Sequence, residues 1–148
     1  MSTLNKKAAE TMLRFKAHAC TDITGFGLLG HLAEMLRNTE VSAELEMDSI
    51  PIIREVRNLA AAGTIPGGTY NNLEFVNDEV SFHGLSKINQ LLLADAQTSG
   101  GLLISFSPED AAGFVELFNV ESEIKASSSL AGSSQNKDAL IQCEVNPC

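Results

Sequence analysis

Tryptophan is absent from this chain of 148 residues, and one tyrosine and seven phenylalanines make up its whole aromatic content. This scarcity argues against an aromatic-rich binding module and predicts an aliphatic core of Leu, Ile, Val and Ala. The sequence also lacks any run of about 18 apolar residues, so it contains no candidate membrane span. A chain of this length can bury the core of one domain without help from a disulfide or a metal.

Basic residues are also few, because ten Lys and Arg stand against nineteen Asp and Glu. The resulting net charge of −9 argues against nucleic acid as a partner, since phosphate backbones need a basic face. Residues 1–37 carry five basic and three acidic side chains, whereas the remainder carries five basic and sixteen acidic ones. An anion would therefore favour the N-terminal third, unless these cations are only the solvated face of a first helix.

Cysteine and histidine give no sign of a metal site. The three cysteines have no metal-ligand spacing, and an odd number without a signal peptide indicates a reducing, cytoplasmic compartment. Cys20 is expected to pack as a small buried hydrophobe. His31 lies among apolar residues and is expected to be a structural histidine, as is His18, whereas His83 is expected in a loop.

The hydrophobic pattern predicts a mixed α/β fold in a single domain over residues 1–148, with its core in residues 1–126. A strand with one wet face at 41–47 favours a two-layer α/β (α+β) arrangement, in which helices cover a sheet. Helical spacing is found at 5–15, 26–37, 51–62, 85–92 and 108–118, and further strands are predicted at 101–106 and 138–145. By composition, 64–72 is a loop that either touches a ligand or only connects, and 127–137 is a flexible serine-rich loop.

One glycine-rich run carries the clearest chemistry. Residues 19–31 read Ala-Cys-Thr-Asp-Ile-Thr-Gly-Phe-Gly-Leu-Leu-Gly-His, so Asp22 stands on a turn that opens into an apolar helix. Such a turn brings backbone N–H groups close to an anion, and an aspartate beside it can hold the magnesium of a nucleotide. Gly25, Gly27 and Gly30 approximate G-x-G-x-x-G, but the strand and the later acidic residue of a dinucleotide fold are missing. A tight turn and helix start without ligand is the alternative interpretation.

A second run repeats this chemistry. Residues 93–105 read Leu-Ala-Asp-Ala-Gln-Thr-Ser-Gly-Gly-Leu-Leu-Ile-Ser, with an aspartate, small hydroxyl residues and paired glycines before an apolar strand. Together with Ser2-Thr3-Leu4-Asn5 and with the segment 60–69, the two runs stand in an order that resembles the C-terminal domain of selenophosphate synthetase (selenide, water dikinase). That family belongs to the aminoimidazole ribonucleotide (AIR) synthetase superfamily. The resemblance covers residues 1 to about 120.

The resemblance implies an AIR synthase C-terminal-domain-like fold, with a mixed sheet covered by helices. It also implies docking against an N-terminal ATP-binding catalytic domain, which dimerises in the full-length enzyme. That domain, with the catalytic cysteine or selenocysteine and its lysine, has no counterpart in these 148 residues. No catalytic residue is therefore expected in this chain.

Residue by residue, Asp22 resembles the aspartate that joins those of the N-terminal domain around Mg²⁺ on the substrate ATP. Thr24, Gly25 and Gly27 match the turn that brings this aspartate to the nucleotide. The second run matches residues that either donate to phosphate or allow close packing under the site: Thr98, Ser99, Gly100 and Gly101.

The reaction implied by the resemblance converts selenide, ATP and water into selenophosphate, AMP and phosphate. Because one aspartate cannot hold two magnesium ions and a triphosphate, the chain alone is expected to make no selenophosphate. Two alternatives stay open: the C-terminal domain of another superfamily member (AIR synthetase, hydrogenase maturation or thiamine-monophosphate kinase type), or a non-catalytic domain that binds a ligand or partner. Ala96 stands where the family usually has proline, and the family's final strand is not recognisable.

Overall fold

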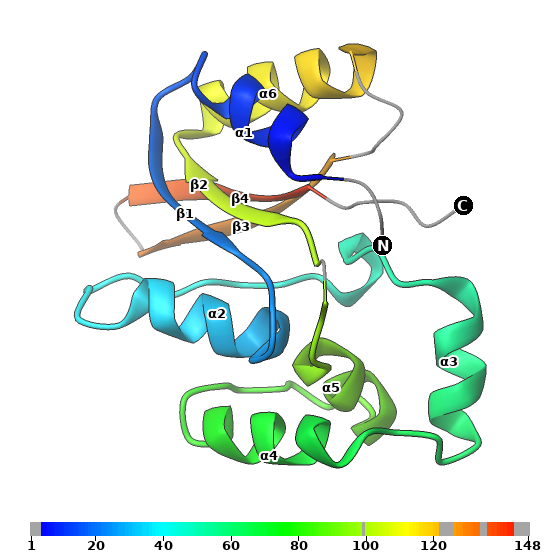
Figure 1. Cartoon of the computed structure of the whole chain (residues 1–148). Coiled ribbons are helices and arrows are strands. Elements are labelled where there is room, and N and C mark those ends of the chain that lie inside the picture. The colour runs from blue at the N-terminus through cyan, green and yellow to red at the C-terminus, as the bar shows by residue number, and fades with distance from the viewer. Residues whose placement is uncertain (1–3, 99, 122–125, 134–135, 144–148) are drawn as a thin grey trace.

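The computed structural model describes residues 4–98, 100–121, 126–133 and 136–143, and it confirms a mixed α/β fold (Figure 1). Four strands pair in the order β1-β2-β4-β3: β1 Ala17–Asp22, β2 Leu102–Phe106, β3 Ala126–Ser133 and β4 Asn136–Cys143. All three pairings are antiparallel, so the expectation of a mixed sheet is wrong for the described strands. None of the described helices is long and apolar enough to cross a membrane.

Helices lie on both faces of this sheet, which corrects the expected two layers to three. The helices α1 Lys6–Met12 and α6 Pro108–Glu121 pack on one face, above the sheet in Figure 1. On the other side lie α2 Gly27–Leu36, α4 Gly67–Val76 and α5 Lys87–Ala94, with α3 Arg54–Ala61 and the short 3-10 turn Met47–Ser49 at one end.

The alternation of β2 divides the core in two. Leu102, Ile104 and Phe106 pack toward α1 and α6, where Phe114 and Phe118 are fully buried. The phenylalanine rings meet closely there, with Phe106 and Phe114 centroids 5.1 Å apart and those of Phe114 and Phe118 5.5 Å apart.

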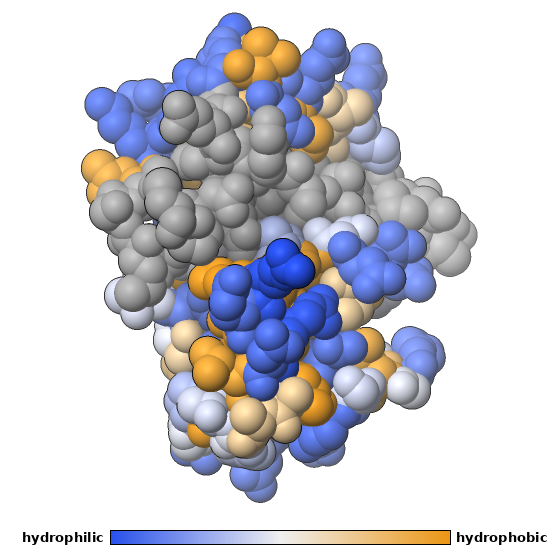
Figure 2. All heavy atoms as spheres, turned by 90° about the vertical axis from the view of Figure 1, so that its right-hand side faces the viewer, coloured by the Kyte–Doolittle hydropathy of each residue, from blue (hydrophilic) through white to orange (hydrophobic). Residues whose placement is uncertain are grey.

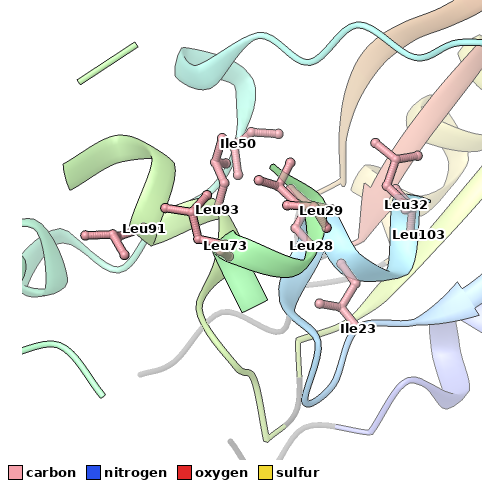
Figure 3. Packing of buried hydrophobic residues seen from close by; sticks show 11 residues of the cluster. Ile23, Leu28, Leu29, Leu32, Ile50, Leu73, Leu91, Leu93 and Leu103 are labelled. Carbon is pink, nitrogen blue, oxygen red and sulfur yellow. The ribbon is translucent and has the colours of Figure 1, made fainter. Parts of the chain in front are cut away.

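Leu103 points to the opposite face of the sheet. There it joins the larger cluster, which lies between the sheet and the helices α2, α4 and α5. Figure 3 shows Leu103 beside Leu32 of α2, and Ile23 at the start of the turn that follows β1. Leucines of α4 and α5 belong to the same cluster, which therefore joins the sheet to all three helices.

Most predicted helices are confirmed, but three other predicted segments differ. The loop predicted at 64–72 is confirmed only for 64–66 and is wrong for 67–72, because α4 begins at Gly67. The flexible loop predicted at 127–137 is wrong for 127–133 and 136–137, which belong to the antiparallel strands β3 and β4, and 134–135 lie outside the described residues. The strand predicted at 138–145 is confirmed by β4 as far as Cys143, and 144–145 lie outside the described residues. The predicted strand 41–47 is absent from the described structure, which has only an isolated bridge at Ala43.

The polar side of α3 is at the surface. Figure 2 looks onto this end of the molecule, where hydrophilic side chains gather in the middle of the view. Arg54, Glu55, Arg57 and Asn58 are all exposed on α3, whereas Ala60 is buried. The helix thus contacts the core through a narrow apolar side only.

The aromatic cluster predicts a large loss of stability for Phe114→Ala. This ring is fully buried and stacks between Phe106 and Phe118, so its removal leaves a cavity and should cost about 3–5 kcal/mol in the free energy of unfolding. Val120→Ala on the same helix is the control, because Val120 is 81% exposed. Urea denaturation should show a change of less than about 0.5 kcal/mol for that variant, and equal losses for both variants would contradict the assigned core.

Candidate functional site

The turn after β1 is built against the second glycine run. Asp22 is the last residue of β1 and pairs with Leu102 of β2. Past the strand, Ile23 N donates to the Gly101 carbonyl at 3.0 Å, and Gly100 N donates to the Ile23 carbonyl at 3.1 Å. Backbone pairing therefore continues beyond the sheet into both runs.

Thr24 connects the two runs again. Its carbonyl accepts hydrogen bonds from Gly27 N at 3.1 Å and from Gln97 N at 2.9 Å. Residues 22–27 and 97–101 thus lie side by side, although some 70 residues separate them in sequence. Thr98 is exposed beside this contact, and Ser99 lies outside the described residues.

Gly27 and Gly100 occupy positions where two backbone segments lie too close together for a side chain. Gly27 has φ +68°, and a Cβ on it would come within 2.7 Å of the Ala94 carbonyl group. A Cβ on Gly100 would come within 2.7 Å of the Ile23 carbonyl oxygen. Gly25, in contrast, has open space around it. At Gly27 and Gly100 the structure therefore supports the close-packing interpretation.

The helix α4 holds the same turn from the opposite side. Asn72 Nδ2 donates to the Gly25 carbonyl at 2.8 Å and to the Ala94 carbonyl at 3.0 Å. Thr69, which is buried, donates from Oγ1 to Asp95 Oδ1 at 2.6 Å. Sequence reasoning missed both residues, because it treated this segment as a loop. The spacing of the buried residues Thr69, Leu73 and Val76 was the signal for one helix face.

Asp22 is exposed at the edge of this assembly. In the part of the chain that the structure describes, its carboxylate makes no ion pair or side-chain hydrogen bond. The described residues also contain no group of three or more His, Cys, Asp or Glu that could hold a metal. Among the described residues, the Asp22 carboxylate therefore stands alone at the end of β1.

Cys20 corrects an expectation, because the residue is exposed and not a buried hydrophobe. It stands two residues before Asp22, opposite Ile104 in the sheet. Partial burial of the thiol raises the pKa of Cys20, and the Asp22 carboxylate raises it further. Both effects disfavour the thiolate, so the residue is unsuited to act as a nucleophile.

Part of the basic excess near the N-terminus is structural. Lys7 Nζ lies 2.7 Å from Glu121 Oε2, and Arg14 Nη1 lies 3.1 Å from Glu121 Oε1. These hydrogen bonds lower the pKa of Glu121 and connect α1 to α6. The two cations are therefore engaged away from the Asp22 turn.

The histidines fall largely as expected. His31 is buried and hydrogen-bonded within α2 and its turn, and His83 lies in an exposed turn with φ 43°. His18 is exposed on β1.

Comparison with known proteins agrees with this architecture. Residues 1–128 match the family model described as "AIR synthase related protein, C-terminal domain". The chain belongs to this family. Its AIR synthase related fold confirms the expected fold type, with the sheet corrected as above.

Several curated relatives are named selenide, water dikinase. The one from Treponema denticola is 48% identical over 116 residues, which are 78% of this chain and 33% of that protein. The relative from Caldanaerobacter subterraneus subsp. tengcongensis is 49% identical over 75% of this chain and 32% of its own length, and that from Geobacter metallireducens is 44% identical over 79% and 34%. The chain is therefore homologous to the C-terminal part of these enzymes and spans about a third of their length.

The space around Gly27 and Gly25 in this AIR synthase related domain predicts different effects on stability when each is replaced by alanine. Gly27→Ala should lower the free energy of unfolding by at least about 2 kcal/mol, because the new Cβ meets the Ala94 carbonyl group and the positive φ strains it. Gly25→Ala should change it little, since nothing lies within 4 Å. Thermal unfolding of both variants measures this, and a stable Gly27→Ala protein would refute the described packing.

The raised pKa of Cys20 predicts slow alkylation. At pH 8 the folded chain holds less Cys20 thiolate than an unstructured thiol, so iodoacetamide should modify Cys20 more slowly in the native chain than in the denatured one. Asp22→Asn should speed the reaction, because it removes a neighbouring negative charge. Peptide mapping by mass spectrometry follows Cys20 alone, and equal rates in both states would contradict the assignment.

Proposed function

We propose that this domain contributes Asp22 to the magnesium–ATP site of a selenide, water dikinase, which makes selenophosphate from selenide, ATP and water and releases AMP and phosphate. The observation that carries the proposal is the exposed Asp22 carboxylate, which has no ion pair among the described residues and lies on a turn held by backbone hydrogen bonds to the second glycine run. The homology to the C-terminal part of enzymes of that name supports it.

The chemistry of Asp22 suits magnesium. A carboxylate is a hard oxygen donor, and Mg²⁺ is commonly held by one or two carboxylates together with phosphates. When bound, the ion neutralises charge on the phosphate groups. Because the described residues add no further ligand cluster to Asp22, its companions would come from the part of the enzyme that lies outside the match.

The residues around Asp22 orient it and hold it in place. Gly27 and Gly100 allow close backbone contact, and Asn72 holds the Gly25 carbonyl from α4. A turn fixed in this way loses little conformational freedom when a ligand arrives. The exposed Thr98 stands beside the turn, where its hydroxyl is suited to donate to a phosphate oxygen.

This role requires a partner. We propose the N-terminal catalytic part of the enzyme as that partner, with a homodimer in the full-length protein and cytoplasmic activity. The 148 residues alone would then make no selenophosphate, because a single aspartate cannot hold the metal ions and the nucleotide.

A chimeric enzyme tests the role of Asp22. In it, all 148 residues replace the C-terminal third of the Treponema denticola relative, and selenide-dependent release of AMP from ATP is measured. The chimera should be active, and Asp22→Asn should lower its rate by at least about 100-fold, because loss of a ligand should cost more than the loss of an outer-shell group. The magnesium concentration for half-maximal rate should rise as well.

Glu116→Gln in α6 is the matched control, since it also converts an exposed carboxylate to an amide. It should leave the rate unchanged. A chimera in which Asp22→Asn is as active as the parent would refute the metal role. Selenide-dependent AMP formation by the 148 residues alone would refute the need for a catalytic partner.

A further inference from the structure

A buried histidine lies behind the Asp22 turn. His31 is 8% exposed, in the second turn of α2. Side chains of a helix lean toward its N-terminus, so the imidazole faces back to the turn that precedes α2. Its Nε2 lies 3.0 Å from Thr24 Oγ1, seven residues earlier.

Thr24 is the residue on which the turn converges. Its carbonyl accepts from both Gly27 N and Gln97 N, and its side chain contacts His31. Backbone bonds therefore fix Thr24 to the second run, and the imidazole fixes its side chain to α2. Asp22 is only two residues away, so a shift of Thr24 would move the carboxylate.

The other ring nitrogen faces the side chain of Glu34, three residues further along α2. Glu34 Oε2 lies 3.4 Å from His31 Nδ1, and the Glu34 side chain is half-exposed. The hydrogen bond between Nε2 and Thr24 Oγ1 can form in either direction, because a hydroxyl both donates and accepts. The imidazole therefore holds the Thr24 side chain whichever ring nitrogen carries the proton.

We propose that His31 is a positioning residue: its buried imidazole fixes the Thr24 side chain and thereby the turn that presents Asp22. This role rests on the proposed function, because positioning matters only if Asp22 meets a ligand. It goes beyond packing, since a histidine that only fills the core would influence stability and not the geometry of the turn.

Hydrogen exchange on the 148-residue chain tests whether the bond between His31 and Thr24 fixes the turn. This measurement needs no enzymatic activity. His31→Leu and Thr24→Val each remove the bond, so the amides of Gly27 and Gln97 should exchange roughly three- to tenfold faster, as expected for one lost hydrogen bond. His31→Gln should restore slow exchange, because its amide can reach Thr24. Thr11→Val is the control, since the buried Thr11 hydroxyl has no partner among the described residues. Unchanged exchange in both His31→Leu and Thr24→Val would overturn the proposal.

The chimeric enzyme tests positioning. His31→Leu and Thr24→Val should each lower kcat about tenfold with the KM for ATP little changed, the double variant should be no worse than either, and His31→Gln should recover most of kcat. Thr11→Val should leave kcat intact. If Asp22→Asn abolishes activity while His31→Leu and Thr24→Val retain full kcat, the positioning role is refuted and the proposed function stands. If the parent chimera is inactive, the proposed function fails, and the exchange experiment alone decides whether His31 fixes the turn.

Discussion

Antiparallel pairing between β1 and β2, continued by the backbone bonds of Ile23 and Thr24, is the interaction on which the rest of the site depends. It brings residues 22–27 onto residues 97–101 and directs the chain from the sheet into α2. Because these bonds join main-chain atoms, they tolerate changes of most side chains but no added Cβ at Gly27 or Gly100. The position of Asp22 is thus a consequence of backbone geometry.

Much of this arrangement could be predicted from sequence. The helices α1, α2, α5 and α6 follow the apolar period of their residues, and β2 is a short continuous apolar run. The contact between the two glycine runs could not be predicted from the periodicity of apolar residues, which reports only local structure. The family resemblance implied it, because the two runs lie far apart in the sequence.

The segments whose secondary structure was not predicted correctly share one physical cause. In each of them, tertiary contacts and not the local sequence pattern determine the backbone conformation. β1 has the burial pattern of a half-solvated edge strand, and its sequence Ala-His-Ala-Cys-Thr-Asp has little apolar alternation. The segment 41–47 does alternate, and Ala43, Leu45 and Met47 do pack on the core, but among the described residues its backbone forms only an isolated bridge at Ala43. β3 is rich in serine and is a strand because β4 pairs with it along its whole length.

The same reasoning explains why the site residues divide into those that sequence could identify and those that it could not. Asp22 is recognisable because an exposed carboxylate beside glycines has few structural uses. Asn72 and His31 are ordinary helix residues in sequence, and their importance comes from what they reach: the Gly25 carbonyl in one case and the Thr24 hydroxyl in the other. A turn held from the sheet, from α2 and from α4 leaves its carboxylate little freedom to adjust. In the proposed function, a carboxylate so constrained suits a site whose remaining ligands belong to another rigid part, because both halves can then meet without reordering either one.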